Sequence, residues 1–122
     1  MPALEIGDVP LFDGFPAGRA VLDAVAATVG DLDGVTTRVS RTQVAFRRRR
    51  GFAYVWRPGQ HLRSGVPAVL SIALPREIAS SRVKEVAHPS PHVWMHHLEM
   101  HRPDQVDDEV AAWLSEAWEA AA

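Results

Sequence analysis

QVAFRRRRGFAYVWR, residues 43–57, decides the fold because it carries the pattern of a β-hairpin. Two segments rich in β-branched and aromatic residues flank a run of arginines that ends in Gly51. A three-residue loop, Arg49-Arg50-Gly51, would place Gly51 in the left-handed conformation that such a turn requires. The cross-strand pairs predicted from this loop are Arg48 with Phe52, Phe46 with Tyr54, and Val44 with Trp56.

This register sorts the hairpin side chains onto two faces, because successive side chains of a strand point to opposite sides. The predicted core face contains Val44, Phe46, Phe52, Tyr54 and Trp56. The predicted exposed face contains Gln43, Ala45, Arg47, Ala53, Val55 and Arg57. A second interpretation makes the aromatic rings a base-stacking platform beside the arginines. The helices need an apolar sheet face to bury against, which favours the core interpretation.

Hydrophobic periodicity outside the hairpin predicts two helices and four further strands. Apolar residues at helical spacing predict a helix over Pro16–Val29, where proline suits the first turn. An apolar stripe between Val106 and Trp118 predicts a C-terminal helix that opens at Pro103-Asp104, with Asp104 as its N-cap. The further predicted strands are Val35–Ser40, Ala68–Leu74, Arg82–Ala87 and Val93–Met100.

This order of elements favours an α+β fold. We expect a two-layer sandwich in which an antiparallel sheet of about five strands carries the N-terminal and C-terminal helices on one face. The 122 residues suit a single domain, 1–122, with residues 1–12 as a loosely docked arm. The absence of cysteine excludes thiolate sites and fits a reducing compartment. Without a signal peptide or an apolar run of membrane-spanning length, we expect a cytoplasmic protein that has no membrane partner.

The charges are strongly segregated along the chain. Eleven of the thirteen basic residues lie between Arg38 and Lys84, and this window contains one acidic residue, Glu77. The segments before and after it are acidic, so the net charge of −2 conceals a basic centre. Such a centre is expected to present a cationic face to an anionic partner.

The candidate anion site lies on the predicted exposed face of the sheet. Guanidinium groups bind phosphate and carboxylate in a bidentate manner, and an amide adds a directional hydrogen bond. The residues predicted to hold the anion are Arg41, Gln43, Arg47, Arg57, Arg82 and Lys84. The alternative is an ordinary solvated face whose arginines meet acidic helices of the same chain. The acidic ends also oppose non-specific attraction to nucleic acid.

Histidines are concentrated between residues 88 and 101. His96 shares a strand face with apolar residues, which predicts a hydrogen-bonded core histidine. His97 points the other way, beside Met95, and is the better candidate for a general base, with His96 second. A metal site could use only His97, Glu99 and His101, which share one strand face but lack a second-shell pattern, so no metal and no cofactor are expected.

Several segments together resemble a bacterial family, the domain of unknown function 5655. They are SRTQVAFRRRRGFAYVW (Ser40–Trp56), RVKEV (Arg82–Val86), WMHHLE (Trp94–Glu99) and DDEVAAWLSEAW (Asp107–Trp118). The resemblance covers roughly residues 12–119, with departures at Val83 and Trp118 that concern packing. It implies no established reaction. Relatives beside nuclease-like domains suggest an accessory binding role by analogy.

Three functions follow from these patterns. The first is a non-enzymatic binding module whose basic sheet face recognises an anionic group on a phosphate-bearing ligand, a nucleic acid or an acidic protein segment. The second is a small enzyme that uses His97 or His96 beside the arginine face, although the chain contains no known catalytic motif. The third is a homodimeric or partner-interaction domain in which the sheet face or the apolar N-terminal arm packs on another chain.

Overall fold

The computed structural model describes residues 4–58 and 65–122. Within these residues six strands form one antiparallel sheet in the order β1-β2-β3-β4-β6-β5. The strands are β1 (Thr36–Val39), β2 (Val44–Arg47), β3 (Gly51–Trp56), β4 (Ala68–Leu74), β5 (Glu85–Ser90) and β6 (Val93–Met100). The predicted antiparallel sheet is therefore confirmed, with one strand more than the five expected.

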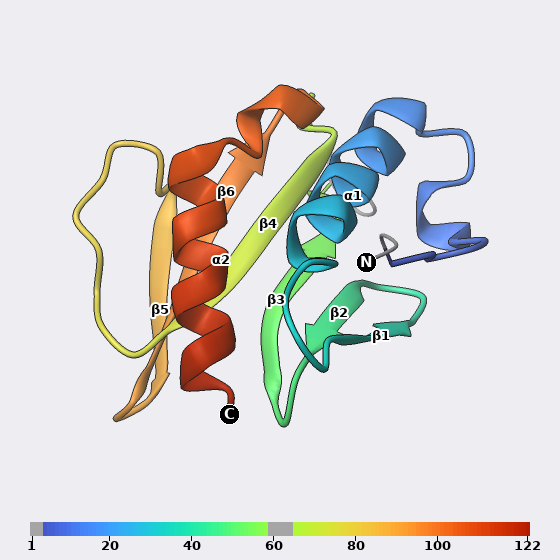
Figure 1. The fold of residues 1–122 in the computed structure, drawn as a ribbon. Coiled ribbons are helices and arrows are strands. Elements are labelled where there is room, and N and C mark those ends of the chain that lie inside the picture. The colour runs from blue at the N-terminus through green and yellow to red at the C-terminus, as the bar shows by residue number, and fades with distance from the viewer. Residues whose placement is uncertain (1–3, 59–64) are drawn as a thin grey trace.

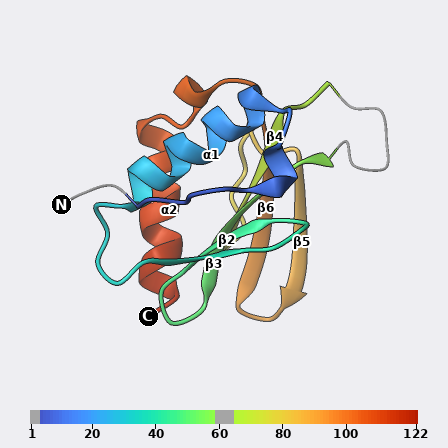
Figure 2. The same ribbon diagram turned by 90° about the vertical axis from the view of Figure 1, so that its right-hand side faces the viewer.

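Both long helices pack on the same face of the sheet. Helix α1 (Pro16–Val29) has the predicted bounds, and α2 (Asp108–Ala120) crosses β3 and β4. Figures 1 and 2 show the helices in one layer and the strands in the other. The α+β two-layer prediction is confirmed. No helix in the described part of the chain is long and apolar enough to cross a membrane.

Helix α2 begins later than the sequence predicts. Pro103–Gln105 form a separate 3-10 helix, η3, and the backbone of Val106 then leaves helical geometry (ψ 74°). Asp107 is the N-cap, because its carboxylate accepts a hydrogen bond from the Val110 N–H at 3.2 Å. The prediction of Asp104 as the cap is wrong, since Asp104 lies within η3 instead.

The N-terminal arm is docked more firmly than expected. A second 3-10 helix, η1 (Pro10–Phe12), places Leu11 and Phe12 in the core, and Val9 is buried beside them. Gly18 on α1 allows this contact, because a Cβ at that position would overlap the Phe12 ring. The apolar residues of the arm therefore pack against their own chain.

The hairpin register differs from the prediction because β3 contains a β-bulge. Phe46 pairs with Ala53, and the next residue, Arg47, pairs with Gly51, so Phe52 is the extra residue. Phe52 and Ala53 are consecutive in the chain, and both are fully buried in the core. Gly51 does not adopt the left-handed conformation that the predicted loop would require.

The bulge reverses the predicted faces of β3. Ala53 and Val55 are fully buried on the helix side, whereas Tyr54 and Trp56 lie on the opposite side and are only half-buried. The prediction that Tyr54 and Trp56 belong to the core is therefore wrong. On β2 the predicted faces hold, because Val44 and Phe46 are buried against the helices and Gln43, Ala45 and Arg47 alternate with them.

The hairpin loop is held by the C-terminal end of α2, which accounts for the register. The Arg48 guanidinium donates to the Trp118 carbonyl at 3.2 Å and lies 3.8 Å from the centre of its ring. Arg50 donates to the Ala120 carbonyl. The last carbonyls of a helix have no intrahelical donors, so these arginines satisfy them and complement the helix dipole. This contact fixes where the loop closes and is invisible in the local sequence.

We predict that Trp113→Ala lowers the free energy of unfolding by about 3–5 kcal/mol, because it removes a buried aromatic side chain where α2 meets the core. Equilibrium urea denaturation followed by circular dichroism measures the loss. Ala112→Gly, at an exposed position of the same helix, is the control and should cost about 1 kcal/mol. A loss below 1 kcal/mol for Trp113→Ala would show that α2 is not docked as described.

Candidate functional site

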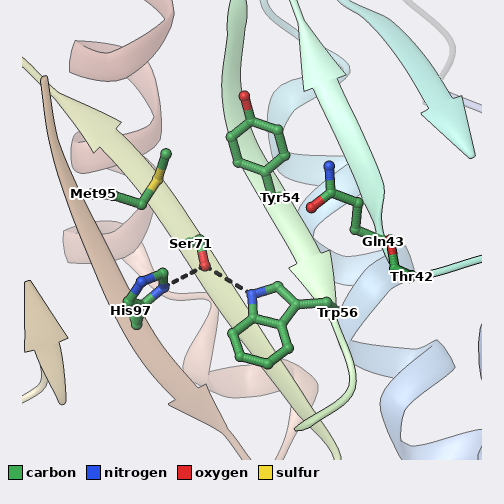
Figure 3. Close-up of a pocket in the computed structure, with 7 residues that line it drawn as sticks. All are labelled: Thr42, Gln43, Tyr54, Trp56, Ser71, Met95 and His97. Atoms are coloured by element: carbon green, nitrogen blue, oxygen red, sulfur yellow. Dashed lines mark hydrogen bonds between the residues drawn. The ribbon is translucent and has the colours of Figure 1, made fainter. Parts of the chain in front are cut away.

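A hollow of about 570 Å³ opens on the sheet face opposite the helices. The side chains that line it come from the turn before β2 and from β3, β4 and β6, as Figure 3 shows. They are Thr42, Gln43, Tyr54, Trp56, Ser71, Met95 and His97. We call this site the open-face hollow, and the sheet side that carries it the open face.

A short hydrogen-bond chain forms the floor of the open-face hollow. The Trp56 indole N–H donates to Ser71 Oγ at 2.9 Å, and Ser71 Oγ lies 2.6 Å from His97 Nδ1. An indole N–H can only donate, so the serine oxygen accepts from it and can either donate to Nδ1 or accept from it, according to the tautomer of His97. In either tautomer Nδ1 is occupied by Ser71, and Nε2 is the ring nitrogen that remains for another partner.

Three polar groups of the hollow lack partners within the protein. His97 Nε2, the Gln43 amide and the Tyr54 hydroxyl make no hydrogen bond to any residue that the structure describes. All three side chains are half-buried, so solvent or a ligand must satisfy them. The Trp56 and His97 rings stand edge to face, with centroids 6.1 Å apart, which leaves aromatic surface beside these donors.

Two arginines lie on the open face beside the hollow. Arg47 follows buried Phe46 on β2, and Arg38 on β1 pairs with Ala45, so alternation directs both to this face. Neither side chain forms a hydrogen bond or ion pair within residues 4–58 and 65–122. Their charges are therefore available to a ligand.

The opposite side of the open face is acidic. Glu85 on β5 pairs with His97, and Glu99 on β6 lies two residues from it, so both carboxylates share its face. The electrostatic potential therefore changes from positive along β1 and β2 to negative along β5 and β6. A ligand that has an anionic end and an uncharged end fits this gradient in one orientation.

The structure places several of the other predicted anion-binding residues away from Gln43 and Arg47. Arg57 packs over the Phe15 ring at 3.8 Å and donates to the Leu11 carbonyl at 3.2 Å, so it anchors the N-terminal arm. Lys84 and Arg41 are exposed, Lys84 just before the edge strand β5 and Arg41 in the turn before β2. The expectation of one continuous cationic face is therefore wrong.

Arg82 serves the helix layer. It forms ion pairs with Asp107 at 2.9 Å and with Glu109 at 3.0 Å, both at the start of α2. The hydrogen bond from Arg82 holds the pKa of the Asp107 carboxyl below its ordinary value. Arg82 therefore does not belong to the candidate anion site. For this residue the alternative holds, in which an arginine meets an acidic helix of the same chain.

The two candidate histidines have different environments. His96 is 1% exposed, its Nε2 accepts from the Ile78 N–H at 2.9 Å, and its Nδ1 lies 3.0 Å from the Trp94 carbonyl. The prediction of a core histidine is confirmed, and His96 has no free nitrogen for acid–base work. His97 lies beside Met95 in the open-face hollow, as predicted.

The proposed metal ligands do not form a cluster. His97, Glu99 and His101 are spaced along one strand and its end, and no group of three potential ligands that could hold a metal ion occurs among the described residues. The donor set of the open-face hollow is one imidazole, one amide and hydroxyl groups. This set suits hydrogen bonding to an acceptor-rich ligand better than metal coordination.

A comparison with family models places nearly the whole chain in one family. Residues 12–121 match the model described as a domain of unknown function, DUF5655. The chain belongs to the DUF5655 family. Comparisons with curated proteins and with solved structures find no match. The family assignment agrees with the resemblance in the sequence and adds no activity to it.

Sequence reasoning identified Gln43, Arg47 and His97 in this DUF5655 domain but missed Ser71, and its favoured interpretation placed Trp56 and Tyr54 in the core. Ser71 carried a readable signal, because it is the one hydroxyl in the otherwise apolar strand AVLSIAL. It is 3% exposed and therefore needs a polar partner. The position of Trp56 and Tyr54 depends on the bulge at Phe52, for which the sequence contains no comparable signal.

We predict that Ser71→Ala lowers the free energy of unfolding by about 1–3 kcal/mol, because the Trp56 N–H and His97 Nδ1 lose their shared partner. Thermal or urea denaturation provides the value. Ser115→Ala on α2 is the matched control and should change stability by no more than about 0.5 kcal/mol, since Ser115 makes no hydrogen bond that depends on its side chain within the described residues. Equal effects of the two substitutions would contradict the hydrogen-bond chain.

Proposed function

We propose that this DUF5655 domain is a non-enzymatic binding module that recognises an anionic ligand at the open face. The ligand places a flat, acceptor-rich group in the open-face hollow and its anionic group against Arg47 and Arg38. Phosphate-bearing ligands, nucleic acids and acidic protein segments are the classes that this chemistry admits.

One observation carries the proposal. Aromatic surface, unpartnered hydrogen-bond donors and two unpaired guanidinium groups occur together on one sheet face. Half-buried donors are costly to leave unsatisfied, and unpaired arginines gain little within the fold. Both features are typical of a recognition site, where convergent polar groups select the ligand and apolar surface supplies affinity.

The enzyme alternative rests on the distance of 2.6 Å between Ser71 Oγ and His97 Nδ1. A serine and a histidine in this contact resemble an activated nucleophile with its base. Two facts weigh against it: Ser71 is 3% exposed, and the Trp56 N–H donates to the same oxygen and lowers its nucleophilicity. Labelling of Ser71 by a fluorophosphonate, detected by mass spectrometry, would support the enzyme; unlabelled Ser71 supports the binding module.

The homodimer hypothesis loses one of its two possible interfaces. It offered the sheet face or the apolar arm, and Val9, Leu11 and Phe12 of the arm are buried in the core of their own chain. We therefore give precedence to ligand binding at the open face.

Retention on phosphocellulose at low ionic strength tests the binding proposal. We predict that Arg38→Ala combined with Arg47→Ala abolishes retention and changes the free energy of unfolding by less than about 1 kcal/mol, since both side chains lie on the surface without internal partners. The matched control combines Arg76→Ala with Lys84→Ala. This control also removes two positive charges, one from the Arg76–Glu116 ion pair and one from the exposed Lys84. It should preserve retention on phosphocellulose. Equal losses in both variants would reduce the effect to net charge and contradict the proposal.

A further inference from the structure

A second hollow of about 360 Å³ adjoins the open-face hollow. It lies at the end of the sheet where β4 ends at Leu74, between the two hairpin turns, and it extends to Ala117, Ala120 and Ala121 at the C-terminal end of α2. Tyr54 and Met95 line both hollows. The two hollows are therefore neighbours along the strand direction. A ligand that spans both must be longer than one that fills either.

The aromatic side chains are arranged as successive stacking surfaces. Tyr54 and Trp56 are two residues apart on the same face of β3, which places their Cα atoms about 7 Å apart. Flat rings of successive ligand units can stack on successive aromatic side chains of a strand. His97 and the Gln43 amide lie beside them with free hydrogen-bonding groups, which suit the edges of unpaired bases.

The charges lie beside this path. Arg38 and Arg47 on β1 and β2 flank the aromatic strand, and Glu85 and Glu99 repel an anionic backbone from the far side. A chain with regularly spaced phosphates can run along β1 and β2 while its bases reach the rings. An acidic peptide would supply the charge but no rings, and a duplex would keep the faces of its bases stacked internally.

We infer that the ligand is a single-stranded nucleic acid that crosses the open face from the open-face hollow to the second hollow. This inference rests on the proposed function and narrows it to one class of anion. Affinity then comes from stacking on Tyr54 and Trp56 and from phosphate contacts to Arg38 and Arg47. It increases with ligand length until both hollows are filled.

Isothermal titration of the whole protein at low salt tests the inference with four probes: thymidine monophosphate, a ten-nucleotide oligothymidylate, a ten-base-pair duplex and a ten-residue polyglutamate. Single-strand sites on small binding domains cover about 4–16 nucleotides, and the ten-nucleotide probe lies within this range. We expect it to bind at least about tenfold more tightly than each of the other probes. The logarithm of the association constant falls linearly with the logarithm of the salt concentration. We expect Arg38→Ala combined with Arg47→Ala to make this slope less steep by about 0.7 for each phosphate contact that is lost.

The outcomes separate this inference from the proposed function. Equal affinity for the monophosphate and the oligonucleotide, or tighter binding of the duplex or polyglutamate, overturns the single-strand inference and keeps an anion-binding module. Failure of all four probes to bind contradicts both.

Gly51 provides a variant that perturbs the path without removing any charged or aromatic group. A Cβ at this position would overlap the Tyr54 hydroxyl, so Gly51→Ala must displace a ring that lines both hollows. We expect about a tenfold loss of oligonucleotide affinity, because Tyr54 is one of the two stacking surfaces. Gly65→Ala is the control, because its Cβ meets no atom of the described residues within 4 Å. Unchanged oligonucleotide affinity in Gly51→Ala, with retained thermal stability, would overturn the path across Tyr54.

Discussion

The β-bulge at Phe52 is the constraint on which the rest of the site depends. It inserts one residue into β3, so Phe52 and Ala53 both enter the core beneath the helices. Every residue after the bulge then takes the face opposite to the one that a regular strand would assign. Tyr54 and Trp56 are thereby released from the core and become the aromatic wall of the open-face hollow. Without the bulge, the open face would present small side chains and have no hydrogen-bond chain to Ser71.

Periodic segments were predictable from the sequence, and features set by distant contacts were not. Helix α1 and strands β4 and β6 have the predicted bounds, because each buries a regular apolar pattern against the core. The hairpin register depends on Arg48 and Arg50, which bind carbonyls at the end of α2, 70 residues away in the chain. Gln43 and His97 could be assigned to the open face by alternation alone. Trp56 could not, since its face depends on the bulge.

The fold resolves its segregated charges by using most of the arginines internally. Arg82 and Arg76 fasten the segment between β4 and β5 to the acidic helix α2, and Arg57 holds the N-terminal arm. Surface ion pairs of this kind contribute little stability individually. Their main consequence is that they neutralise some arginines and leave others without an acidic partner. On the open face that charge is at Arg38 and Arg47. A diffuse basic segment in the sequence thus becomes a local cationic border beside one hollow.

The most direct test of this account is the surroundings of the Trp56 indole in solution, measured by nuclear Overhauser effects to its N–H proton. The bulged register predicts cross-peaks from this proton to Ser71 and His97, because Trp56 Nε1 lies 2.9 Å from Ser71 Oγ on the open face. The regular hairpin register would bury the ring beneath the helices. Cross-peaks from Trp56 to Val110 or Leu114 of α2, with none to Ser71 or His97, would contradict the bulge and the site built on it.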